Sequence, residues 1–250
     1  MLKAYKYRLY PNKEQQEYFA KTFGCVRFIY NRMLSDKIEY YKETKQKLNN
    51  TPAQYKKEFE WLKEVDSLAL ANAQMNLQTA YNNFFKRPDV GFPKFKSKKN
   101  NHYSYTTNNQ GGNIYVSDKY IKLPKIGLVK VKKHREFDGL IKSVTVSKVP
   151  SGKYYVSVLV KQEDIEKLPE CSNTLGIDLG IKEFAITSNG EMIENPKFLR
   201  QSEDRLRKLQ KDLSRTKKGS KNRNKCRIKV AKQHEKIANQ RKDFLNKLSK

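Results

Sequence analysis

From residue 12 onward the spacing of apolar residues changes twice along this 250-residue chain, and each change marks a change of secondary structure. Between residues 12 and 87 the spacing is helical, most clearly at Leu70, Ala73, Leu77, Tyr81 and Phe84. Between 103 and 162 it alternates with a period of about two, typical of strands. After Pro196 it is helical again. We therefore expect a protein of the α+β class, with helices and antiparallel strands in separate segments.

The alternating segments predict a small antiparallel β-barrel, or alternatively a sandwich, formed by residues 1–11 and 88–170. Its longest hairpin joins residues 141–149 to 153–161 through Pro150-Ser151-Gly152. Residues 2–10 also alternate and are expected to pair into the same sheet. The helices of 12–87 then form a bundle inserted into this β domain. Asn12 is predicted to cap its first helix, Gly24 to separate that helix from a second, and Asp66 or Ser67 to cap the longest one.

A third region, residues 171–250, begins with three short strands near 174–179, 183–188 and 191–194. The dipeptide Asn189-Gly190 predicts a tight hairpin turn between the last two. Two basic helices follow Pro196, and residues 200–250 carry 19 lysines and arginines but only five acids. We expect the loop from Lys217 to Arg223 to join them.

The charge of the chain restricts its partners. With 53 Lys and Arg against 26 Asp and Glu, the net charge is +27, which predicts a polyanionic partner and above all nucleic acid. No apolar run approaches the roughly 20 residues that span a bilayer. The N-terminus has no secretory signal, so we expect a cytoplasmic, nucleoid-associated protein without a membrane partner. The alternative is a basic surface kept for solubility.

The cysteines and histidines do not predict a zinc site. The three cysteines, Cys25, Cys171 and Cys226, are far apart in sequence, as are His102, His134 and His234. No pair has the spacing of zinc ligands. We expect free thiols and no zinc within this chain.

Two segments are predicted to bind nucleic acid. Between Phe92 and Lys99, aromatic residues alternate with cations, a composition suited to stacking on bases and pairing with phosphates. The alternative is a basic linker whose two phenylalanines pack against the fold. The second segment is the loop near 217–223. The candidate residues are Lys94, Lys96, Lys98, Lys99, Lys217, Lys218, Lys221 and Arg223.

Asp178 is the candidate for chemistry. It lies within the apolar strand Gly176-Ile177-Asp178-Leu179-Gly180. Burial of a carboxylate in such a strand costs several kcal/mol without a compensating cation or donor, so Asp178 is predicted to bind a metal ion. A carboxylate on the central strand of a three-stranded meander is suited to holding Mg²⁺ for phosphodiester hydrolysis. The alternative is an ordinary Asp that caps a turn.

Several separated motifs resemble the TnpB (OrfB) family of bacterial insertion sequences, whose members are RNA-guided DNA nucleases related to type V CRISPR effectors. They occur in the family's order along the whole chain. These motifs are Tyr7-Arg8-Leu9-Tyr10-Pro11-Asn12, Arg27-Phe28-Ile29-Tyr30-Asn31, Ala80-Tyr81-Asn82-Asn83-Phe84-Phe85, Gly91-Phe92-Pro93-Lys94-Phe95, Leu123-Pro124-Lys125 and Gly176-Ile177-Asp178-Leu179-Gly180-Ile181-Lys182.

The resemblance implies a role for each region. The β region resembles a wedge domain, the helical insertion a recognition lobe, and residues from 171 the start of an RNase H-like (RuvC) nuclease domain. Guide RNA and target DNA are the implied partners and Mg²⁺ the implied cofactor. Asp178 corresponds to the first catalytic acid and metal ligand. Asn72 and Asn76, with Thr107 on a basic loop, are implied readers of the motif beside the DNA target.

The chain departs from the family pattern at its end. The family's later Glu, its final Asp and its Cys-x-x-Cys pairs have no counterpart among these 250 residues. We therefore expect a truncated chain that binds nucleic acid but does not cleave it alone, since one carboxylate cannot hold two metal ions.

Two alternatives remain. The first is a nuclease-dead regulator that binds RNA or DNA. The second is an actin-like or sugar-kinase ATPase, whose phosphate loop also reads Gly-x-Asp-x-Gly. In those ATPases a small hydroxyl residue follows the second glycine, whereas Ile181 follows it here, and a charge of +27 favours a polynucleotide over a small metabolite.

Overall fold

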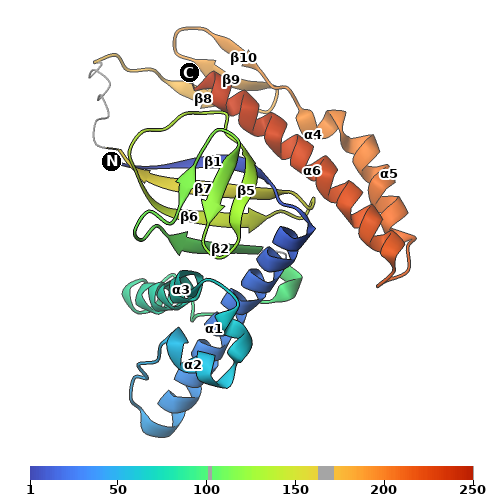
Figure 1. Cartoon of the computed structure of the whole chain (residues 1–250). Helices are drawn as coiled ribbons and strands as arrows, with labels where there is room; N and C mark the ends of the chain where they lie inside the picture. The colour runs from blue at the N-terminus through green and yellow to red at the C-terminus, as the bar shows by residue number, and fades with distance from the viewer. Residues whose placement is uncertain (101–102, 163–171, 250) are drawn as a thin grey trace. The chain divides into compact units, whose positions relative to one another are not determined.

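The computed structural model of the protein describes residues 1–100, 103–162 and 172–249 (Figure 1). The chain forms two compact units, Met1–Ile165 and Glu166–Lys250. The expected boundary between residues 170 and 171 lies outside the described residues.

A seven-stranded antiparallel sheet forms the β part of the first unit. Its strands follow the order β2-β6-β7-β1-β5-β4-β3. β1 lies inside the sheet, with Tyr5 opposite Val158 of β7 and Leu9 opposite Val131 of β5, which confirms the predicted pairing of the N-terminal strand. The strands are β1 (Leu2–Tyr10), β2 (Tyr103–Asn108), β3 (Tyr115–Val116), β4 (Tyr120–Leu123), β5 (Gly127–Lys132), β6 (Leu140–Lys148) and β7 (Tyr154–Lys161).

The prediction of a closed barrel was wrong for the part of the chain that the structure describes. β2 and β3 end the strand order and do not pair with each other. β3 has only two residues, so it offers too short an edge to close the sheet, while β2 packs against helices α1 and α3. The sheet is therefore open.

The helical insertion consists of α1 (Lys13–Thr44), α2 (Pro52–Glu58), a 3₁₀ turn (Glu60–Lys63) and α3 (Ser67–Lys86). A second 3₁₀ turn covers Lys98–Asn100. The predicted capping box at Asn12 is present, because its Oδ1 accepts the Gln15 amide at 2.8 Å and Gln15 Oε1 accepts the Asn12 amide at 3.0 Å. Asp66 caps α3 through the Leu68 amide at 3.1 Å.

The predicted break at Gly24 was wrong, since α1 runs through it without interruption. Phe23, Cys25 and Val26 are all buried on either side of the glycine. A glycine inside a helix costs only about 0.5–1 kcal/mol, and packing of these neighbours offsets that cost.

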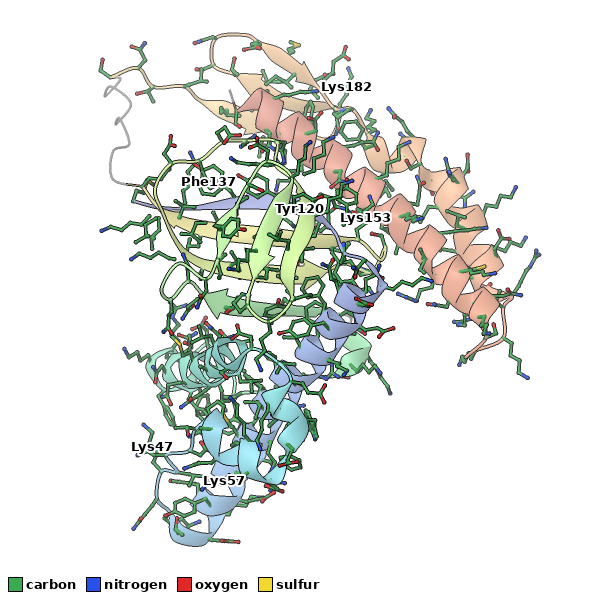
Figure 2. All side chains as sticks on the ribbon, in the orientation of Figure 1. Lys47, Lys57, Tyr120, Phe137, Lys153 and Lys182 are labelled. Atoms are coloured by element: carbon green, nitrogen blue, oxygen red, sulfur yellow. The ribbon has the colours of Figure 1, made fainter. Side chains whose placement is uncertain are left out.

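The sheet and the helical insertion share one hydrophobic core. Phe19 of α1 is fully buried, and its ring centroid lies 6.2 Å from that of Tyr105 on β2 and 5.7 Å from that of Tyr154 on β7. Phe137, labelled in Figure 2, lies on the sheet. Its ring packs against that of Tyr5 on β1, with centroids 5.3 Å apart. The helices thus fold with the sheet rather than as a separate domain.

The second unit has a three-stranded antiparallel sheet of order β10-β9-β8. The strands are β8 (Ile177–Leu179), β9 (Glu183–Thr187) and β10 (Met192–Glu194), followed by α4 (Phe198–Gln201), α5 (Glu203–Ser214) and α6 (Lys221–Leu248). The predicted turn at Asn189-Gly190 is present, with Gly190 at φ 84° and its amide donating to the Thr187 carbonyl at 2.9 Å. Across the described residues, none of the helices has the length and apolar character that a bilayer crossing requires.

Candidate nuclease site and nucleic-acid interface

Asp178 lies on β8, opposite Ile186 of β9, and its side chain is exposed. Two sequence-based expectations about it were wrong in the described structure. β8 is an edge strand rather than the central one, and the carboxylate is not buried. The reason is that neither face of β8 is covered: Ile177 and Leu179 are 61% and 72% exposed. The carboxylate is therefore available to a ligand, and no desolvation cost acts on it here.

Local contacts explain why glycine occupies the positions on both sides of Asp178. The Gly176 amide donates to Ser188 Oγ at 3.1 Å, and the Ser188 amide donates to the Gly176 carbonyl at 2.8 Å. At Gly180, a Cβ atom would lie 2.9 Å from the Glu183 carbonyl oxygen, closer than real Cβ atoms come. These contacts fix the short β8–β9 hairpin and hold Asp178 on a defined strand.

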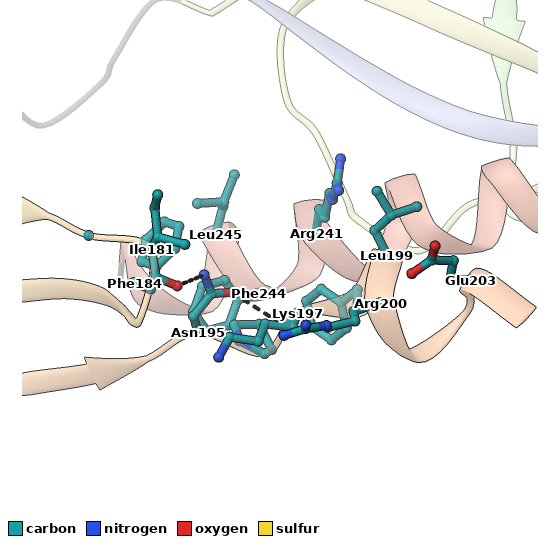
Figure 3. Close-up of a pocket in the computed structure, with 13 residues that line it drawn as sticks. Ile181, Phe184, Asn195, Lys197, Leu199, Arg200, Glu203, Arg241, Phe244 and Leu245 are labelled. Atoms are coloured by element: carbon teal, nitrogen blue, oxygen red, sulfur yellow. Dashed lines mark hydrogen bonds between the residues drawn. The ribbon is translucent and has the colours of Figure 1, made fainter.

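A cavity of about 720 Å³ lies beside the segment that follows β8 (Figure 3). Asn195 Nδ2 donates to the Ile181 carbonyl at 3.0 Å, and the Lys197 amide donates to Asn195 Oδ1 at 3.0 Å. Phe244 of α6 packs edge-on against Phe184 with centroids 5.0 Å apart. Helix α6 and the β8–β9 hairpin are thereby tied together around a cavity whose rim includes Lys197, Arg200 and Arg241.

Asp178 supplies one hard oxygen ligand for a divalent cation, but not a complete site. The described residues contain no group of three or more His, Cys, Asp or Glu side chains arranged to hold a metal ion. Within that same part of the chain Asp178 makes no hydrogen bond or ion pair, so its two carboxylate oxygens are open. Mg²⁺ is often held by only one or two carboxylates, with water and substrate phosphates completing its shell. Asp178 fits the role of one such ligand.

The two described cysteines, Cys25 and Cys226, are free thiols. Cys25 is buried, and desolvation raises the pKa of its thiol to about 11, so it stays protonated at neutral pH. Cys226 is half-buried and free. Cys171 and His102 lie outside the described residues.

The basic helices α5 and α6 pack as a hairpin. Lys217, Lys218 and Lys221 are exposed at its tip, but Lys221 begins α6 instead of lying in the loop. Arg223 is half-buried and has a structural task. Its Nη1 donates to the carbonyls of Leu213 and Thr216, both at 3.0 Å, and so caps the end of α5.

The segment from Phe92 to Lys99 is fixed to the helical insertion. Asn31 holds the backbone of Lys96 by two hydrogen bonds, accepting its amide at 2.7 Å and donating to its carbonyl at 2.9 Å. The Lys96 ammonium lies 4.1 Å from the Tyr30 ring centroid, and desolvation lowers its pKa. Phe92 packs edge-on against Phe84 at 5.3 Å.

The segment therefore combines features of both predictions, a packed linker and a nucleic-acid-binding surface. Phe92 is 44% exposed and packs edge-on against Phe84, as in a linker, whereas Phe95 is 56% exposed. Exposed side chains also include Lys94, Lys96, Lys98 and Lys99. The exposed members form a basic, aromatic surface of the kind that contacts nucleic acid.

The three implied readers of the target-adjacent motif differ in their surroundings. Asn76 of α3 is exposed, whereas Asn72 is half-buried and its Nδ2 donates to the Leu68 carbonyl at 2.8 Å. Thr107 was expected on a loop but lies on β2, and its side chain is fully buried. Its hydroxyl donates to Asp66, the residue that caps α3. Thr107 thus holds α3 against the sheet and offers no hydroxyl to a base in this conformation.

The structure brings together a cluster of cations and tyrosine rings that the sequence did not indicate as a nucleic-acid-binding candidate. On neighbouring strands β1 and β7, Lys6 and Arg8 lie 4.7 Å and 5.1 Å from the ring centroid of Tyr155. Arg8 also lies 5.5 Å from the ring of Tyr10. The alternation of aromatic and cationic residues in 2–10 was the available signal, but the sequence did not show that Tyr155 would lie beside them.

Two segments of the chain match models of known protein families. A family described as "Probable transposase" (OrfB_IS605) matches residues 157–250, and the family's "Helix-turn-helix domain" matches residues 1–46. In the structure, residues 1–46 contain β1 and the uninterrupted helix α1.

Two curated relatives align with nearly the whole chain. A "Putative RNA-guided DNA endonuclease" of Streptomyces pristinaespiralis is 35% identical over 259 residues, covering 99% of this chain and 63% of the relative. A "Putative RNA-guided DNA endonuclease InsQ" of Escherichia coli K12 is 30% identical, covering 99% of this chain and 62% of the relative. The chain thus spans less than two thirds of each relative's length.

A solved structure of a Cas12f1 complex with a single guide RNA and target DNA shares the fold. It aligns with a TM-score of 0.56 at 14% identity, covering 91% of this chain and 60% of the Cas12f1 chain. At this identity the likeness concerns the fold alone. The family matches over residues 1–46 and 157–250, with the two relatives that align with 99% of this chain, show that the chain belongs to the OrfB (TnpB) family of insertion-sequence proteins.

Proposed function

We propose that this chain is the guide-RNA- and target-DNA-binding part of an RNA-guided DNA endonuclease carried by a mobile element. The observation that carries the proposal is the 35% identity along 99% of the chain to a relative named as such an endonuclease. The charge of +27 agrees with a nucleic-acid partner. We place its action in the cytoplasm, on the cell's DNA.

In this proposal the first unit binds the guide RNA and the DNA beside the target. The supporting features are the exposed Lys94, Lys98 and Lys99, and Asn76 on the surface of α3. Base pairing between guide and target would supply sequence specificity, while protein side chains contact the backbone. Lys217, Lys218 and Lys221 at the tip of the α5–α6 hairpin are proposed to contact phosphates in the same way.

The second unit is proposed to be the start of a RuvC-like nuclease domain. Asp178 would be one ligand of Mg²⁺, and the bound ion would activate water and stabilise the leaving oxygen of the phosphodiester. The protein's own contribution is positional: Gly176, Ser188 and Gly180 fix the strand that carries the carboxylate. The exposed Ile177 and Leu179 suit a strand that further strands or helices cover.

Asp178 is the single acid that the described residues bring to the proposed site, so the 250-residue chain is expected to bind RNA and DNA without cutting. A chimaera that adds the part of the Streptomyces relative beyond this chain's span is expected to cleave a matched duplex in Mg²⁺. Cleavage should fall at least about 10³-fold in Asp178→Asn, as for loss of a catalytic ligand, while RNA affinity stays within about twofold. Gel-resolved cleavage and RNA pull-down measure the two effects.

Glu191→Gln is the matched control, since Glu191 is an exposed acid in the turn before β10 of the same sheet. It should leave cleavage unchanged. Specific cutting by the 250-residue chain alone would refute the single-ligand interpretation. RNA binding with an inactive chimaera would favour the alternative of a nuclease-dead regulator. The supporting observation is that the described residues hold no group of three or more His, Cys, Asp or Glu side chains arranged for a metal ion.

A further inference from the structure

A second cavity, of about 540 Å³, lies in the helical insertion between the C-terminal halves of α1 and α3. Its volume is within the roughly 300–1,000 Å³ typical of small-molecule sites. Tyr41 from α1, Tyr81 and Phe85 from α3, and Phe92 from the following segment contribute aromatic rings. Phe92 begins the segment predicted above to bind nucleic acid, but neither Asp178 nor any of the lysines proposed above to contact nucleic acid lines this cavity.

The aromatic lining is exposed to an unusual degree. Phe85 is 76% exposed, Tyr41 57% and Phe92 44%. Large exposed apolar patches mark interaction or ligand sites, so three large rings gathered at one open cavity indicate a partner that covers them. The rings of Phe85 and Phe92 are also fixed in place, because Phe84 packs edge-on against both, with centroids 5.1 Å and 5.3 Å apart. A fixed platform of this kind loses little entropy when a flat ligand binds.

The charged and amide side chains that line the cavity indicate the kind of ligand it fits. Lys37, Lys42 and Lys47 are the charged lining residues, and no acid lines the cavity. The amide side chains of Gln46, Gln78 and Asn82 add hydrogen-bond donors and acceptors. Aromatic faces, amides and an all-positive rim complement the face, edge and phosphates of a nucleotide.

One end of the cavity is formed by the loop after α1. Lys37 Nζ donates to the Leu48 carbonyl at 2.6 Å and so fixes this loop to the helix. Lys47 projects from the same loop at the end of the helical insertion (Figure 2). The Lys45 ammonium lies 5.9 Å from the Tyr41 ring centroid, which adds a further cation beside the aromatic lining. Lys42, Lys45 and Lys47 thus lie along or beside the aromatic lining, where they could contact the phosphates on both sides of an inserted base.

We propose that this aromatic cavity binds an unpaired nucleobase of a single-stranded nucleic acid. The base would stack on Phe85 and Tyr41, while Lys42 and Lys47 contact the neighbouring phosphates. The inference rests on the proposed function in one respect, that the chain binds nucleic acid. It adds a base-stacking site in the helical insertion that the family comparison does not assign.

The test compares two single-stranded oligomers by fluorescence anisotropy with the 250-residue chain. One is an oligouridylate of about ten nucleotides, within the usual site size, and the other has the same backbone without bases. Phe85→Ala should weaken the first about tenfold, as for loss of one stacked base, and leave the second unchanged. A 2-aminopurine placed in the first oligomer should be quenched by the wild-type chain and not by Phe85→Ala. Because Phe85 is 76% exposed, the substitution should leave the fold intact, as thermal unfolding would verify.

Tyr115→Ala is the matched control. Tyr115 on β3 is 47% exposed and lies 5.7 Å from the Lys122 ammonium, but it does not line this cavity. It should leave both affinities within about twofold, the scatter of surface changes. Equal loss in Tyr115→Ala and Phe85→Ala, or no loss in Phe85→Ala, would overturn the proposal.

Two further outcomes separate the cavity from the proposed function. If the chain binds both oligomers equally and Phe85→Ala changes neither, only the cavity assignment fails. If the wild-type chain binds neither oligomer nor its guide RNA, the proposed function fails with it. Displacement of the oligouridylate by an acidic amphipathic peptide, dependent on Phe85, would assign the cavity to a protein partner and also overturn the proposal.

Discussion

At the scale of the residue, burial decides what a polar side chain can do. Thr107 was expected to read a base, yet its hydroxyl is buried and donates to Asp66, which also accepts the Leu68 amide at the start of α3. Asp178 was expected to be buried, yet it is exposed. In both cases the residue type was informative about possible chemistry, but the neighbours in space set its role.

Replacement of Thr107 tests this structural role. Thr107→Val keeps the shape of the side chain but leaves an oxygen of Asp66 without its donor, so the free energy of unfolding should fall by about 1–3 kcal/mol. Urea unfolding followed by circular dichroism measures it. Thr79→Val is the control, because Thr79 is exposed and its hydroxyl bonds only its own helix at Met75. An unchanged stability in Thr107→Val together with weaker DNA binding would instead restore the base-reading role.

At the scale of the element, the packing of a helix face can outweigh a single residue of low helix propensity. The helical spacing of Phe19, Phe23, Val26, Ile29 and Met33 continues across Gly24, and all five are buried. This continuous stripe outweighs the propensity of one glycine, which is why α1 has 32 residues. The capping positions Asn12 and Asp66 and the turn at Asn189-Gly190 are local features, and the sequence predicted them correctly.

Gly24→Ala should therefore stabilise the first unit by about 0.5–1 kcal/mol, since the helix has ordinary φ there and alanine is the better helix former. A Cβ at Gly24 meets no atom within 4 Å. Thermal unfolding gives the difference. Gly152 of the β6–β7 turn is equally open but has φ 89°, so Gly152→Ala should destabilise by about 1 kcal/mol. Stabilisation at both positions would show that backbone conformation is not the deciding factor.

At the scale of the whole molecule, charge is the strongest property. Replacing Lys217, Lys218 and Lys221 together by Gln should reduce the slope of log K against log salt for single-stranded RNA by about 2, because each phosphate contact contributes about 0.7. Filter binding at several salt concentrations measures the slope. Lys56, Lys57 and Lys63 form a control triple with the same change in net charge, and Lys56 and Lys63 already bond Ser67 and Glu60. Equal changes in the two triples would indicate a general charge effect rather than contacts at the hairpin tip.

The sequence by itself determined the mixed α+β class, the helical and strand segments, most caps and turns, the basic character and the family. All of these depend on local spacing, composition or motifs, which the chain carries in its own order. The tertiary structure decided the open sheet, the uninterrupted α1, the edge position of β8, the buried Thr107 and the aromatic cavity of Tyr41 and Phe85. These features depend on which residues distant in sequence meet. Period and propensity cannot show that, because packing and strand pairing are fixed only when the chain folds.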